Sequence, residues 1–174
     1  MAVSQLFGLP AHPLFAHLAV VAVPLAALLV AVVAVFPRVP RLVKITTLVL
    51  GGLSVAVVAL MESSGKALEE RVTETAAVER HTEMGETLLP WVVGLLVVIV
   101  AGLAIDWRLT PARRGAVSGR LVTVGLAVVA VAVAAGTLVQ TVRIGHSGAQ
   151  ATWSDTGPST PSPAGVGPGE QGED

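Results

Sequence analysis

Four long apolar stretches constrain what this chain can fold into. They contain hardly any charge and run over residues 14–36, 42–61, 88–105 and 121–142. A helix needs about 20 mostly apolar residues to cross a hydrocarbon core of about 30 Å, so each stretch is long enough to do so. We therefore predict an all-α fold, a bundle of four transmembrane helices formed within residues 1–153.

The composition agrees with a chain that is surrounded by a lipid bilayer. Hydrophobic residues make up 53% of the chain and charged residues 13%, whereas about a quarter of the residues of a soluble protein are charged. The mean hydropathy is +0.76. The net charge of -1 argues against nucleic acid as a partner.

Lysine and arginine are distributed unequally between the connections. Seven of the eleven lie in or beside the first and third connections, at Arg38, Arg41, Lys44, Arg108, Arg113, Arg114 and Arg120. The second connection, residues 62–87, has three basic residues against seven glutamates. Because short cytoplasmic loops carry the positive excess, we expect a multi-pass protein of a bacterial plasma membrane with both termini extracytoplasmic.

The second connection consists of good helix formers, so we predict a helical extracytoplasmic loop between the second and third spans. Apolar residues and one histidine recur there at helical spacing and form one stripe. The stripe contains Ala77, Val78, His81, Met84, Gly85 and Leu88. We expect His81 to face inward, Glu79, Arg80 and Glu83 to face water, and the helix to continue past Pro90 into the third span.

After the last span the composition changes to glycine, proline, serine and acidic residues. Residues 154–174 offer nothing that could pack into a core. We predict a disordered, acidic, Gly/Pro-rich tail.

The chain has four histidines, and the predicted orientation assigns all of them to one side of the membrane. They are His12, His17, His81 and His146. They come from three separated segments, and none falls in the basic connections. This one-sided distribution predicts a histidine cluster near the extracytoplasmic boundary.

Two of the segments have further local features. In the sequence Ala11-His12-Pro13 the proline is expected at the first helical position, which leaves His12 just outside the helix. His17 follows about one turn inside. His146 is flanked by glycines at the outer end of the fourth span, where a second backbone or a flat ring can approach closely.

Haem b is the cofactor that fits these residues best. The chain has no cysteine, but neutral imidazoles from two helices of a bundle can ligate haem iron axially without one. Depth in the predicted spans favours His17 and His146 as one pair, with His12 and His81 nearer water as a second pair or as contacts to the propionates. The protein would then be a redox-associated subunit that works with an electron-transfer protein.

Two alternatives stay open from the residues alone. One is a zinc or copper site on two or three imidazoles with a carboxylate such as Glu83. The other is a structural or accessory membrane protein without a cofactor. The P-loop and the serine-hydrolase motif are absent from the sequence, so we do not expect a stand-alone enzyme.

Three quoted stretches together resemble a known family. They are the opening GLPAHPLFAHLAVVAVPLA, the mid-chain ERHTEMGE and the closing GHSGAQATW. Over residues 7–153 the chain resembles the predicted bacterial membrane proteins grouped as domain of unknown function 2231. The resemblance implies a four-helix membrane domain whose activity is not established. In some chains relatives are joined to Rieske or cytochrome c modules, which favours electron transfer by analogy.

Overall fold

The structure is a computed structural model that describes residues 5–6, 8–36, 38–69, 75–108 and 117–153. Five helices account for nearly all of these residues. They are α1 (Ala11–Val35), α2 (Arg41–Glu69), α3 (Ala76–Glu86), α4 (Leu88–Arg108) and α6 (Val117–Trp153). The expected disordered tail, residues 154–174, lies outside the described residues.

Four helical segments are long and apolar enough to cross a membrane. They are Ala11–Val35, Arg41–Glu69, Ala76–Arg108 and Ser118–Trp153. The chain thus has the all-α, four-span architecture that its apolar stretches predict. The helices α2, α4 and α6 are longer than the apolar stretches that they contain, so their ends carry polar residues beyond the apolar part.

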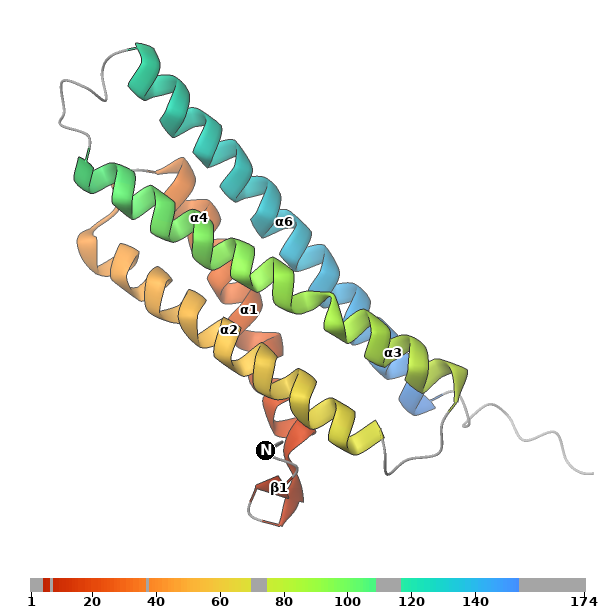
Figure 1. Ribbon diagram of the computed structural model, residues 1–174. Coiled ribbons are helices and arrows are strands. Elements are labelled where there is room, and N and C mark those ends of the chain that lie inside the picture. Colours follow the sequence, from red (N-terminus) through yellow and green to blue (C-terminus); the bar gives the residue numbers. More distant parts are fainter. Residues whose placement is uncertain (1–4, 7, 37, 70–74, 109–116, 154–174) are drawn as a thin grey trace, which may run out of the picture.

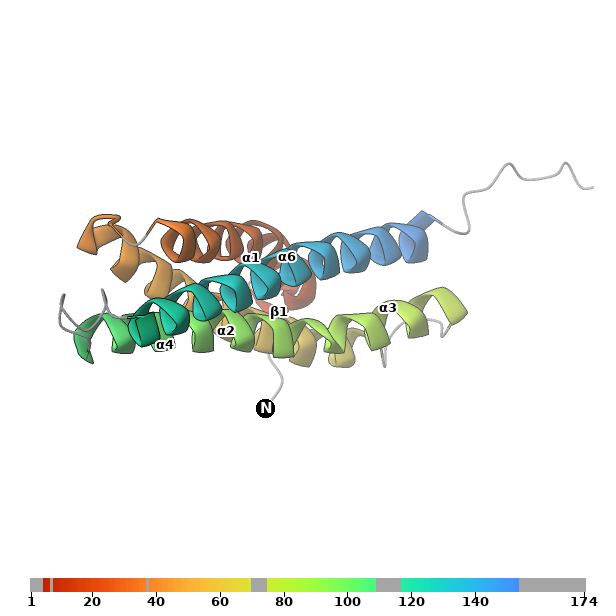
Figure 2. The ribbon, with the colours of Figure 1, turned by 90° about the horizontal axis from the view of Figure 1, so that it is seen from above.

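The helices pack side by side along one direction (Figure 1). α1 contacts both α2 and α6, and α4 also contacts α2 and α6, so the four spans surround one core. α3 and α4 follow one another along the same side of the bundle, and α6 runs beside both of them (Figure 2). Large aliphatic side chains on the outer faces, such as Val21, Val49 and Val128, are exposed on the isolated chain and are placed to contact lipid.

Small residues let the helices approach closely in the core. Ala26 and Ala27 of α1 are completely buried, as are Val58 and Leu95 on the facing helices. Five of the buried residues described carry a hydroxyl group, and three of them donate to a carbonyl four residues earlier in their own helices. These bonds are Thr47 to Val43, Ser54 to Leu50 and Thr137 to Val133. The core therefore satisfies its hydroxyl donors without any polar contact between helices at these positions.

A short hairpin precedes α1. Strands β1 (Gln5–Leu6) and β2 (Leu9–Pro10) pair antiparallel, and Gly8 in the turn has a φ of 79°, which glycine adopts without strain. α1 begins at Ala11, so the expectation that His12 lies just outside the helix is wrong. Pro13 falls within the first turn, where a missing N–H still costs no intrahelical bond, and His12 is therefore helical.

The predicted stripe of the second connection is borne out by the burial of α3. His81 and the other α3 residues of the stripe are half-buried, whereas Glu79, Arg80 and Glu83 are exposed. Thr75 caps the helix by accepting a hydrogen bond from the backbone N–H of Val78 at 3.3 Å. The helix does not continue unbroken into the third span, because α3 ends at Glu86 and Thr87 forms a turn before α4.

Candidate functional site

A cavity of about 870 Å³ opens at one end of the bundle. Side chains from α1, α2, α3, α4 and α6 line it, and among them are His12, His17 and His81. We call this end, formed by the start of α1, the end of α2, α3 and the end of α6, the histidine end. A volume of this size is within the range of about 300–1,000 Å³ that is usual for small-molecule sites.

His12 is held between α1 and α2. Its Nδ1 lies 3.0 Å from the backbone carbonyl of Met61, a residue 49 positions away in the sequence. The ring packs against the backbone of Gly65, where an added Cβ would lie 3.1 Å from ring atoms. Glycine at position 65 therefore gives the imidazole the room to reach across to α2.

His81 is held in the same way between α3 and α6. Its Nδ1 lies 3.0 Å from Oγ of Ser147, which is buried. Ser147 donates its only hydroxyl proton to the carbonyl of Ile144 at 2.9 Å, so its oxygen must accept from His81. An added Cβ at Gly148 would lie 2.9 Å from the ring, so this glycine too makes room for an imidazole.

His17 is exposed and bonds within its own helix. Its Nδ1 lies 2.6 Å from the carbonyl of Pro13. A carbonyl can only accept, and the same holds for the carbonyl that faces His12. In all three lining histidines Nδ1 is therefore the donor, and in the neutral ring the lone pair is on Nε2.

This arrangement is the usual one for a histidine that binds a metal. A ligating imidazole normally donates its other N–H to a carbonyl, a carboxylate or a similar acceptor, which fixes the tautomer and the direction of the ring. The hydrogen bonds that the structure gives to His12, His17 and His81 all use Nδ1. Their Nε2 atoms are the basic groups that remain for a ligand.

Glu62 adds a carboxylate to the wall of the cavity. Its Oε1 is buried and has no hydrogen-bond partner among the described residues. The carboxyl group lies next to the backbone of Leu89 and has Glu86 and Lys66 nearby. A buried oxygen without a partner is costly to leave unsatisfied, so the position is suited to a donor that comes from outside the chain.

The rim of the cavity carries one ion pair. Nζ of Lys66 lies 2.7 Å from Oε1 of Glu86, and both side chains are more than half exposed. The pair connects the end of α2 with the end of α3. An exposed pair of this kind contributes little to stability.

His146 is placed differently from the other three histidines. It is exposed and does not line the cavity, although its neighbours Gly145 and Gly148 do. The structure thus brings His12, His17 and His81 to one cavity and leaves His146 on the outer surface of α6. The pairing of His17 with His146 gains no support from the lining, and it stays a prediction.

No group of three or more histidine, cysteine or acidic side chains that could hold one metal ion occurs in the described part of the chain. The alternative zinc or copper site, on two or three imidazoles with a carboxylate such as Glu83, is therefore not assembled among these residues. Glu83 is exposed and is not part of the cavity wall. The arrangement instead offers single imidazoles at separate points of one wall.

Sequence reasoning did not find Glu62, Ser147 or Gly65 as parts of this site. Glu62 was one of seven glutamates in an acidic connection, and nothing in its spacing set it apart. Ser147 lies next to His146, so its contact with His81 depends on how α3 packs on α6. The glycines that make room for the two rings, Gly65 for His12 and Gly148 for His81, are distant from them in the sequence. The histidine that glycines flank in the sequence is His146, so that signal indicated the wrong ring.

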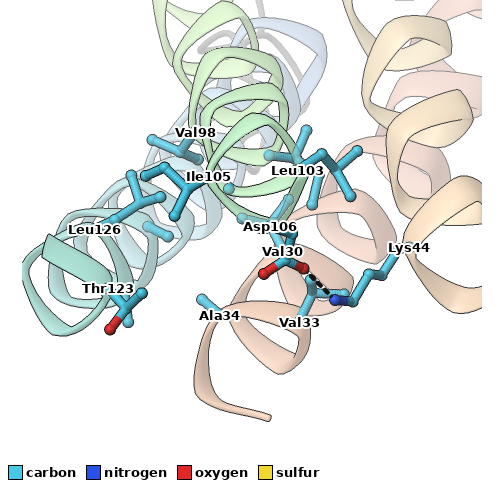
Figure 3. A pocket seen from close by; sticks show the side chains of 14 residues that line it. Val30, Val33, Ala34, Lys44, Val98, Leu103, Ile105, Asp106, Thr123 and Leu126 are labelled. Carbon is cyan, nitrogen blue, oxygen red and sulfur yellow. Dashed lines mark hydrogen bonds and ion pairs between the residues drawn. The ribbon is translucent and has the colours of Figure 1, made fainter. Parts of the chain in front are cut away.

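The opposite end of the bundle holds a much smaller cavity of about 90 Å³. Figure 3 shows Lys44 and Asp106 pointing toward one another across it from α2 and α4, among aliphatic side chains such as Val30 and Leu126. The two side chains form an ion pair and are only 17% and 27% exposed. We call this end the basic end. Asp106 of α4 thus lies between helices.

The comparison with protein families agrees with the architecture of the described helices. The family model of predicted membrane proteins designated domain of unknown function 2231 matches residues 8–160. This chain belongs to that family. No curated protein and no solved structure matches the chain. The match confirms the predicted resemblance over nearly the same residues, and it describes a membrane protein without assigning it an activity.

Proposed function

We propose that this membrane protein binds haem b in the cavity of the histidine end and works as a redox-associated subunit. One observation carries the proposal. Three imidazoles line one cavity, and each donates its Nδ1 proton to an acceptor of the chain, which leaves Nε2 as a ligand atom.

The donor set suits haem better than a bare metal ion. Haem iron already has four equatorial nitrogens and takes only one or two ligands from the protein, so single imidazoles are sufficient. A zinc or copper ion held by the protein alone needs three or four ligands around one point, and the described residues hold no such group. His12 and His81, which are half-buried, are the axial ligands that we favour.

The remaining wall is also compatible with a flat, largely apolar cofactor. Ala16, Ala19, Leu88 and Ile144 supply apolar surface, and Lys66 at the rim is a cation within the lining that a propionate can approach. When bound, haem would supply one-electron chemistry. The chain's residues would hold it, fix the imidazole tautomers and keep water from part of its surface.

The test is an absorption spectrum of the purified protein in mild detergent with haemin added. We expect a Soret band that shifts when dithionite is added. His12→Ala and His81→Ala should each weaken it, and His146→Ala serves as the matched control because that side chain is exposed and outside the cavity. A protein that binds no haemin would overturn the proposal. If only His17→Ala and His146→Ala weakened the Soret band, the axial ligands would be the pair that the sequence predicted.

We also propose that the histidine end faces the extracytoplasmic side of a bacterial plasma membrane. The support is the excess of lysine and arginine in the connections at the basic end. An electron-transfer protein that docks from outside would then approach the cavity directly. A protein without a cofactor, which serves an accessory role, is the alternative if both the haemin spectrum and metal analysis are blank.

A further inference from the structure

The wall of the large cavity is rich in hydrogen-bond acceptors that have no donor. These are the Nε2 lone pairs of His12, His17 and His81 and the buried Oε1 of Glu62. All four belong to residues that line the cavity. They come from α1, α2 and α3.

Several donors on the same wall are already used within the chain. The hydroxyl groups of Thr82, Thr141 and Thr152 each donate to a carbonyl four residues earlier in their own helices. The Nδ1 protons of the lining histidines are used as well. Lys66 is the cation of the described lining, and it is paired with Glu86.

Negative charges outnumber positive ones in the described lining. The carboxylates of Glu62, Glu69 and Glu86 face the cavity together with one ammonium group, that of Lys66. The described lining therefore has an excess of negative charge. A cavity with low-dielectric walls concentrates such a field, so its interior favours a cation, and the propionates of a bound haem would stay at the open rim beside Lys66.

We infer that this cavity binds an organic ammonium compound, a protonated amine on an apolar body. The ammonium group supplies several N–H donors to acceptors that have none among the described residues, and its charge is opposite to the excess that the glutamates give the lining. The apolar body would lie against Leu68, Val78 and Ile144 of the same wall. A bare metal ion would need a denser group of ligands than the described residues provide.

Three probes of nearly equal size separate charge and donors from shape. They are 2-phenylethylamine, 2-phenylethanol and phenylacetate. Binding is measured by calorimetry on the full chain in lipid nanodiscs, with empty nanodiscs as the control for partitioning into lipid. We expect the amine to bind about tenfold or more tightly than the alcohol, which corresponds to one charge-assisted hydrogen bond, and phenylacetate to bind least. Equal affinities of amine and alcohol would overturn the inference.

Substitution of Glu62 tests where the amine binds. Glu62→Gln keeps the size of the side chain and removes its charge, so it should weaken amine binding about tenfold and leave the alcohol nearly unchanged. Glu62→Asp, which keeps the charge, should retain a preference for the amine. Glu83→Gln is the matched control, because Glu83 is exposed on α3 and outside the lining. Equal effects of the substitutions at 62 and 83 would contradict the inference.

This inference does not depend on haem, and the two proposals can fail separately. The probes are added to colourless protein and, in parallel, to protein loaded with haemin. Amine binding by protein that takes up no haemin would leave this inference standing and overturn the haem proposal. Amine binding that is unchanged by haemin loading would show that haem is bound outside this cavity.

Discussion

At the basic end of the bundle Lys44 and Asp106 neutralise one another across a cavity of about 90 Å³. At the histidine end Glu62 and three imidazoles line a cavity of about 870 Å³. Both ends place polar groups between helices. In the first, each charge has its partner within the chain, so the pair holds α2 to α4. In the second, acceptors outnumber donors. A ligand is therefore expected at the second end, and closure of the bundle at the first.

Labelling of intact cells would establish which end faces outward. The chain has no cysteine, so single cysteines can be introduced in place of Glu83 at the histidine end and Arg38 near the basic end, both exposed. We expect a membrane-impermeant maleimide to modify position 83 and leave position 38 unmodified, an all-or-none difference. The reverse pattern would contradict the proposed orientation. Labelling after cell lysis controls for the reactivity of each cysteine.

Loss of Asp106 should have the largest effect on stability. Asp106→Leu leaves the ammonium group of Lys44 in a poorly solvated place, and breaking a partly buried pair of this kind costs about 1–3 kcal/mol. Thermal unfolding in detergent measures the loss. Addition of Lys44→Met should restore much of it, because the uncompensated charge is then removed. If the double variant were as unstable as the sum of the single ones, the two side chains would not be coupled.

Gly148→Ala should disturb the histidine end more locally. A Cβ there would lie 2.9 Å from the ring of His81, so the ring or the helix must move, at a cost of about 1–3 kcal/mol. The measurement is the unfolding temperature together with haemin binding. Gly145→Ala, one turn away with nothing within 4 Å of its Cβ, is the control and should leave the unfolding temperature unchanged. Equal behaviour of the two variants would mean that His81 does not pack as described.

Ser147→Ala should have the smallest effect of the four. It removes the acceptor of the Nδ1 proton of His81, which frees the tautomer and the direction of the ring without deleting the imidazole. Loss of such a supporting hydrogen bond typically lowers metal affinity about 10-fold or more. Titration with haemin measures the change. Ser63→Ala removes a hydroxyl that is bonded to the carbonyl of Leu60 on α2, outside the cavity lining, and should leave haemin affinity unchanged.

The bundle could be predicted from the sequence because its determinants are local. Four apolar stretches of sufficient length give four spans, and the helical spacing of Val78 and His81 gives the inward face of α3. The start of α1 was misplaced by two residues, because Pro13 was taken as the first helical position although Pro10 precedes the helix and Pro13 lies inside its first turn. The break at Thr87 fits Pro90, which has no N–H to donate to the carbonyl of Glu86.

The site could be predicted only in part, because it depends on how helices rotate against one another. The sequence singled out the histidines but not their acceptors, since the carbonyl that faces His12 belongs to Met61 of another helix. Glu62 differs from the other glutamates of the second connection in its buried Oε1 without a partner, and this depends on the packing of the helices. For the same reason the spacing of the histidines in the sequence could not show that His146 lies on the outer surface of α6 while His81 faces the cavity.

The length of α6 bears on how a solute would enter. Its 37 residues extend about 55 Å, while a hydrocarbon core is only about 30 Å thick. The last eleven residues, 143–153, add about 16 Å beyond the apolar stretch, and they form one wall of the large cavity together with α3. The cavity thus extends from the ends of the apolar stretches into these polar turns, and a water-soluble molecule could enter it from that end of the bundle.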